Sequence, residues 1–170
     1  MKLKSLEAIF SALNAVGVRY LVVGGLAVNA HGYQRLTQDL DLVVQLDADN
    51  LRRAVRALVP LGYRPVVPVD IEDIADPEKR TAWIQDKNMQ VFGLVSDTHW
   101  ETPLDLFVTE PFDFEAEYKA AMWGEIAPGL KVGFVTIPTL IDMKEAAGRP
   151  RDLDDIQHLR WLQEEKQKHD

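Results

Sequence analysis

The stretch that decides the fold is YLVVGGLAVNAHGYQRLTQDLDLVV, residues 20–44. Residues 20–23 form a short apolar run with β-branched members, bounded by Gly17 and the Gly24-Gly25 pair, which predicts a buried strand. The small residues at 26–31 predict a helix that starts directly at the glycine pair. Residues 40–44 alternate and then become apolar, which predicts a second strand. The stretch therefore predicts a strand, a tight turn, a helix and another strand.

The Gly24-Gly25 turn predicts a phosphate-binding site. Neither residue has a side chain, so backbone N–H groups can come close to a ligand. The helix that follows would aim its free amides and positive dipole end at the same place. Taken alone, such a pair is more often an ordinary structural turn than a phosphate site, because glycine serves turns freely.

Three aspartates predict a metal site. Asp39 and Asp41 are two residues apart on a strand, so their carboxylates face the same side and repel each other unless protonation, water or a cation relieves them. Asp105 interrupts an apolar strand, where an unpaired carboxylate is costly to bury. If the strands are neighbours, the three acids form an oxygen site suited to Mg²⁺ or Mn²⁺. The alternative for Asp105 is a salt bridge with Arg35 or Lys144.

Outside this stretch, the pattern predicts an α/β (α+β) domain with a mixed β-sheet flanked by helices. We expect strands at 89–95 and 104–108, pairing as a hairpin, and short extended pieces at 125–127 and 131–135. Helices are expected at 3–16, after a cap at Asp47 or Asp49, and at 77–83, 114–122, 140–147 and 153–166. Residues 1–170 are interpreted as a single domain, with a core of about 1–110 and a short helical C-terminal cover of about 111–170.

Composition places the chain among globular proteins. It has 170 residues, 46% of them hydrophobic and 27% charged, and no cysteine. A thiol nucleophile, a zinc-thiolate site and a disulfide framework are therefore excluded, and we expect a cytoplasmic protein with no membrane partner. The net charge of −8 argues against broad salt-driven nucleic-acid binding.

Two motifs carry a family resemblance. Val22-Val23-Gly24-Gly25, then thirteen residues, then Asp39-Leu40-Asp41-Leu42-Val43-Val44 resembles the signature of the DNA polymerase β-like nucleotidyltransferase superfamily. Within it, GGLAVNAHG at 24–32, with Arg35 and Thr37 ahead of the Asp-Leu-Asp, is similar to the small AbiEii-type nucleotidyltransferases, some of which are toxins of toxin–antitoxin systems. Residues 140–156 are also similar to that group.

The resemblance implies a nucleotidyltransferase fold and a metal-dependent enzyme that moves a nucleoside monophosphate from an NTP to a hydroxyl acceptor. The acceptor is a tRNA, a protein or a small molecule, and a cognate antitoxin is a possible partner. The implied metal ligands for Mg²⁺ or Mn²⁺ are Asp39, Asp41 and Asp105, which with Lys144 form the implied catalytic set, and the implied nucleotide contacts are Gly24, Gly25, Arg35, Thr37 and Arg149. Lys144 and Arg149 are equally interpretable as a helix-end charge and a loop guanidinium, and Arg35 as the partner of an aspartate.

One departure from the family pattern bears on activity. Many active members have Ser or Thr directly after the first glycine or the glycine pair, whereas this chain has Gly25 and then Leu26. Backbone amides would then be the main grip on phosphate. Two alternatives follow: a catalytically degenerate nucleotide-binding module, or a toxin–antitoxin component that acts through a protein interface with structural carboxylates.

Overall fold

The computed structural model describes residues 1–170, and residues 20–44 fold as the sequence predicts. Strand β1 (Tyr20–Val23) leads directly into helix α2 (Gly24–His31), and β2 (Leu40–Val44) returns antiparallel to β1. In this register Val23 lies opposite Asp41. The end of β1, the start of α2 and the start of β2 therefore meet at one edge of the sheet.

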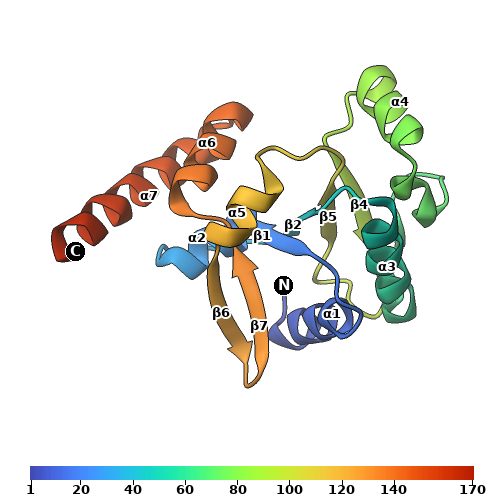
Figure 1. Cartoon of the computed structure of the whole chain (residues 1–170), viewed down its shortest axis with the longest axis horizontal. Coiled ribbons are helices and arrows are strands. Elements are labelled where there is room, and N and C mark those ends of the chain that lie inside the picture. Colours follow the sequence, from blue (N-terminus) through green and yellow to red (C-terminus); the bar gives the residue numbers. More distant parts are fainter.

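The sheet has seven strands in the order β3-β4-β5-β2-β1-β7-β6 (Figure 1). β5 (Leu104–Phe107) runs parallel to β2 and sets Asp105 opposite Asp41. β4 pairs with β5 in antiparallel fashion, as expected for the predicted hairpin. The remaining strands are β3 (Arg64–Pro65), β4 (Val91–Val95), β6 (Met122–Ala127) and β7 (Leu130–Phe134). The sheet is thus mixed, and its centre carries the acidic residues.

Helices flank this sheet, and their ends follow local capping chemistry. The Asp47 side chain accepts a hydrogen bond from Asn50 N and so begins α3 (Ala48–Leu58), whose apolar face packs into the core. The helix α1 (Leu3–Ala15) lies beside α3. The other α-helices are α4 (Pro77–Lys87), α5 (Phe114–Ala120), α6 (Ile137–Ala147) and α7 (Pro150–His169), with short 3₁₀ turns η1 (Val59–Leu61) and η2 (Ile71–Ala75).

The sheet extends past residue 110, where the sequence suggested that the core ends. β7 pairs in parallel with β1, with Val22 opposite Phe134, so the β6–β7 hairpin belongs to the central sheet. The helical cover consists of α6 and α7, which pack against each other and against α2 (Figure 1). Both begin earlier than predicted, because Thr136 caps α6 and a proline occupies the first turn of each helix. None of the helices combines the length and apolarity needed to cross a lipid bilayer.

Candidate active site

The glycine turn is shaped by its neighbours. Gly24 has φ of +66°, a left-handed conformation that favours glycine, and a Cβ atom there would lie 2.9 Å from Asp41 Cγ. The α2 helix begins at this residue, and no side chain caps its first N–H groups. The turn therefore leaves backbone donors at the point where the Asp41 carboxylate approaches most closely.

Thr37 fills the space of a side chain at Gly25. A Cβ atom at position 25 would lie 2.7 Å from Thr37 Cβ and closer still to Thr37 Oγ1, and 3.2 Å from Arg35 Nη1. Contacts under about 3 Å between carbon atoms are strongly repulsive. The hydroxyl that the turn lacks is therefore supplied from the loop before β2, in the volume that a serine at position 25 would occupy.

The three acids share one electrostatic environment. The pKa of Asp41 is raised to about 7, mainly by burial and then by the charges of Asp105 and Asp39, while the charges of Arg149 and Lys144 oppose the rise. Burial and Asp39 likewise raise the pKa of Asp105, partly offset by a hydrogen bond with Asp41. Asp41 and Asp105 are direct register partners, and Asp39 immediately precedes β2.

The three acids have the chemistry to hold a divalent cation. Carboxylate oxygens are the ligands that Mg²⁺ and Mn²⁺ prefer, and mutual repulsion between buried carboxylates is what such a cation relieves. In this structure, however, no three Asp, Glu, His or Cys side chains come together closely enough to form a metal-binding group. Asp41 and Asp105 are the converging pair, and Asp39 contributes charge from the position just before β2.

The cations near the acids do not pair with Asp105, so the alternative of a salt bridge to Arg35 or Lys144 is wrong. Both cations instead contact Asp155 of α7: Arg35 donates through Nε and Nη2 at 2.7 and 2.8 Å, and Lys144 Nζ lies 2.7 Å from Oδ2. Arg35 as the partner of an aspartate is thus confirmed. Its partner is Asp155, a residue that the sequence pattern did not indicate.

A second buried acid completes this α6–α7 ion cluster, which consists of Arg35, Lys144, Arg149, Asp152 and Asp155. Arg149 Nε donates to Asp152 at 2.8 Å, and Lys144 Nζ lies 3.5 Å from Asp152. The side chains of both acids are 1% exposed. Burial alone would raise the pKa of Asp155, but hydrogen bonds from Arg35 and Lys144 outweigh it and lower the pKa.

Ion pairs within this cluster hold the predicted cationic residues Lys144 and Arg149 in place. Lys144 is buried between two carboxylates at the edge of the cleft, so its ammonium group is an ion-pair partner in this structure. Arg149 keeps about half of its side chain exposed, and its charge acts on Asp41. The sequence signal for this cluster was the presence of Asp152 and Asp155 in the first turns of an apolar-faced helix.

One cleft of about 1020 Å³ brings these elements together. Its apolar lining includes Val91, Phe107 and Pro111, and Asp142 of α6 also lines it. Each residue that the sequence proposed for catalysis, metal or nucleotide lines it: Gly24, Gly25, Arg35, Thr37, Asp39, Asp41, Asp105, Lys144 and Arg149. We call it the acidic cleft. It joins the glycine turn, the Thr37 hydroxyl, the three predicted acids and the guanidinium groups of Arg35 and Arg149.

No family model and no curated protein matches the sequence. The fold, in contrast, is similar to those of several solved structures. The lincosamide antibiotic adenylyltransferase LnuA, bound to lincomycin, is 16% identical with a TM-score of 0.58, and the match covers 94% of this chain and 96% of LnuA. ANT(2")-Ia in complex with adenylyl-2"-tobramycin is 12% identical with a TM-score of 0.58, covering 98% and 97%.

A third similar structure is an antigenic nucleotidyltransferase-like protein from Paracoccidioides brasiliensis, which is 17% identical with a TM-score of 0.56. That match covers 92% of this chain and 74% of the other. The likeness to LnuA and ANT(2")-Ia spans nearly the whole of both chains. The glycine turn, the adjacent strands β2 and β5 and the α6–α7 cover therefore belong to one architecture, and this chain has the nucleotidyltransferase fold.

Proposed function

We propose that this protein is a metal-dependent nucleotidyltransferase of the AbiEii-like type, which moves a nucleoside monophosphate from an NTP to a hydroxyl acceptor. The observation that carries the proposal is the register pair Asp41–Asp105 beside the Gly24–Gly25 turn, within a cleft on a nucleotidyltransferase fold. Carboxylates and phosphate-binding amides on adjacent elements suit the transfer of a phosphoryl-linked group.

Three kinds of hydrogen-bond donor would bind the phosphates. The first amides of α2 lack a side-chain cap and carry the positive end of the helix dipole. Thr37 adds a hydroxyl donor in the volume beside Gly25. Arg35 and Arg149 add guanidinium groups on the same cleft, which suit the oxygen atoms of a polyphosphate. The missing Ser or Thr after the glycine pair is thus no argument against phosphate binding.

Asp39, Asp41 and Asp105 would hold the divalent cation, Mg²⁺ or Mn²⁺. When bound, the cation neutralises the polyphosphate and lowers the repulsion among the three acids. Two observations support this assignment: Asp41 and Asp105 are a half-buried pair with raised pKa values, and neither has a cationic side chain as a direct partner.

The reaction forms a bond between the acceptor oxygen and the α-phosphorus and breaks the bond from that phosphorus to the bridging oxygen, so pyrophosphate leaves. Asp105, which lies opposite Asp41 in the β2–β5 register, would accept the acceptor's proton. The α6–α7 ion cluster orients Arg35 and Arg149 toward the cleft. Lys144 would add positive charge beside the triphosphate, from a position that its ion pair with Asp155 fixes.

The acceptor side of the cleft favours a compact acceptor. Val91, Phe107 and Pro111 provide an apolar wall, and Asp142 stands among the lining residues of α6. LnuA and ANT(2")-Ia were solved with lincomycin and adenylyl-2"-tobramycin, respectively. The net charge of −8 disfavours an extended tRNA interface. A small polyhydroxylated molecule is therefore the first acceptor to test, before tRNA, a protein or a cognate antitoxin.

A transfer assay tests the proposal. The protein is incubated with α-labelled NTPs and Mg²⁺, in separate reactions containing polyhydroxylated small molecules, tRNA or protein. We expect label in one acceptor class, loss of transfer in Asp41→Asn, and wild-type transfer in Asp49→Asn, an exposed acid on α3. NTP binding by calorimetry with no labelled product in any class would instead support the degenerate module.

The toxin alternative has its own readout. Growth arrest on expression that persists unchanged in an Asp39→Ala, Asp41→Ala double variant would show that a protein interface, and not catalysis, carries the effect. Arrest that disappears in this variant would support a toxin-type enzyme, provided that the variant accumulates to the same level as the wild type.

A further inference from the structure

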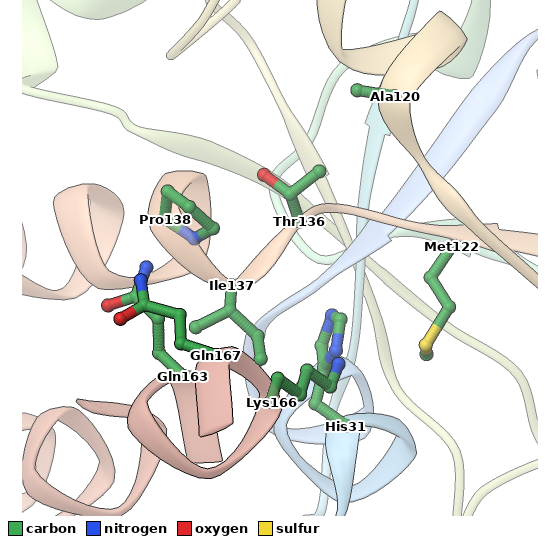
Figure 2. A pocket seen from close by; sticks show the side chains of 9 residues that line it. All are labelled: His31, Ala120, Met122, Thr136, Ile137, Pro138, Gln163, Lys166 and Gln167. Carbon is green, nitrogen blue, oxygen red and sulfur yellow. The ribbon is translucent and has the colours of Figure 1, made fainter. Parts of the chain in front are cut away.

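A second cavity of about 320 Å³ lies away from the acidic cleft, and the two share no lining residue. Figure 2 shows it between the C-terminal end of α2, the start of α6 and the last turns of α7. His31 lies at its inner side, and the apolar walls come from Met122, Ile137 and Pro138. Nothing in the proposed transfer reaction uses these residues.

His31 presents an unsatisfied hydrogen-bond acceptor. Its side chain is buried, with 8% of the residue exposed, and its Nε2 lies 2.7 Å from the Val135 carbonyl oxygen. A carbonyl accepts only, so Nε2 carries the proton and donates. Burial lowers the pKa of His31, which leaves Nδ1 as a bare imine nitrogen. Nδ1 has no hydrogen-bond partner, and native proteins rarely leave such an atom unpaired.

An unpaired cation lies beside this acceptor. Lys166 of α7 forms no salt bridge or side-chain hydrogen bond, and its charge is close enough to lower the pKa of His31. In Figure 2 the Lys166 side chain extends toward the His31 ring. Gln163 and Gln167 line the cavity from the same face of α7, three and one residues away. The cavity therefore combines one acceptor, one positive charge and an apolar wall.

We propose that this cavity binds a small hydroxycarboxylate with an apolar tail. The hydroxyl group donates to His31 Nδ1, the carboxylate pairs with Lys166, and the tail packs against Ile137 and Pro138. One cation matches one negative charge, and an amine in place of the hydroxyl would be repelled by Lys166. The site goes beyond the proposed transfer reaction and stands whether or not that reaction occurs.

Three matched probes with the same apolar tail test the hydroxyl and the carboxylate separately, with the full-length protein at neutral pH. 2-Hydroxyisovalerate carries the hydroxyl, the carboxylate and the apolar tail. Isovalerate lacks the hydroxyl, and 2-hydroxyisovaleramide lacks the charge. The readout is the ¹⁵N resonance of His31 Nδ1 in a protein with labelled histidine. We expect the hydroxy acid to shift this resonance toward that of a hydrogen-bonded nitrogen, and to bind about tenfold more tightly than isovalerate.

Two lysine variants provide the control. Lys166→Met removes the proposed ion pair and should abolish the difference between the acid and the amide. Lys168→Met removes a lysine that pairs with Glu165 on the same helix, and should change nothing. The proposal is overturned if the Nδ1 resonance does not move with any probe up to its solubility. It is equally overturned if the free protein already shows a hydrogen-bonded Nδ1 that Lys166→Met releases, because Lys166 would then be the partner.

Discussion

Replacing Asp41 with Asn should stabilise the metal-free protein at alkaline pH. The pKa of Asp41 in the folded protein is raised from 3.8 to about 7 by burial and by its acidic neighbours. A folded-state pKa above the unfolded value means that the folded protein holds the proton more tightly. Stability is therefore full below about pH 4 and is lost as the pH rises through about 7.

The magnitude follows from the size of this shift. About three pKa units at ~1.4 kcal/mol each give an upper limit of about 4 kcal/mol, and partial exposure of Asp41 reduces this to about 2–3 kcal/mol. An Asn side chain has nearly the same shape, stays neutral and can donate to Asp105. In a protein of this size, each kcal/mol corresponds to about 2–4 °C in Tm, so Asp41→Asn should melt about 4–12 °C above the wild type at pH 8.

The assay is differential scanning calorimetry from about pH 4 to about pH 9 in the presence of a chelator. The difference in Tm between Asp41→Asn and the wild type should be small near pH 4, should grow up to about pH 7 and should level off above it, because the folded and unfolded proteins bind different numbers of protons only between the two pKa values of Asp41. Asp49→Asn, which removes an exposed acid, should follow the wild type at every pH. A difference that is constant across this range, or an Asp41→Asn variant that is less stable at pH 8, would refute the electrostatic reasoning.

Three further predictions concern the cation, the phosphate grip and the ion cluster. Mg²⁺ should raise the Tm of the wild type at pH 8 and leave that of Asp41→Asn unchanged in a thermal-shift titration; equal shifts would contradict a site at these acids. Calorimetric titration should show that Thr37→Ala weakens NTP binding by about tenfold and that Gly25→Ser weakens it because the new side chain clashes with Thr37. The double variant should restore binding, because the serine then supplies the hydroxyl in the space that Thr37 leaves. A double variant that binds more weakly than both single variants would contradict this replacement of one hydroxyl by the other. Urea denaturation should show that Asp155→Asn loses about 3–5 kcal/mol, because the buried Lys144 and the half-buried Arg35 both lose the charge that they pair with. The exposed Asp154→Asn should lose little, and equal losses would contradict the cluster.

Local sequence signals predicted the part of the fold that positions the cleft. The apolar run before Gly24, the alternation around Asp41 and the capping residue Asp47 each act within a few residues, and each element begins where expected. The approach of Asp105 to Asp41 also followed, because an acid in an apolar strand needs a polar neighbour. Such local rules do not depend on the rest of the chain.

Long-range features could not be predicted in the same way. The parallel pairing of β7 with β1 joins residues more than a hundred positions apart, and the Glu125 region reads only as a short extended piece. The insertion of Thr37 beside Gly25 and the pairing of Asp155 with Arg35 depend on how a loop and α7 fold back.

The central claim is that the acidic cleft holds a metal-bound nucleoside triphosphate between the glycine turn and the β2–β5 acids. A crystal of the protein soaked with a non-hydrolysable NTP and Mn²⁺ tests it most directly, because manganese is located by its anomalous scattering. We predict a manganese peak coordinated by Asp41 and Asp105, with the polyphosphate on the amides of Gly24 and Gly25 and on Thr37. Nucleotide bound elsewhere, or in the cleft without manganese at these carboxylates, would contradict the claim.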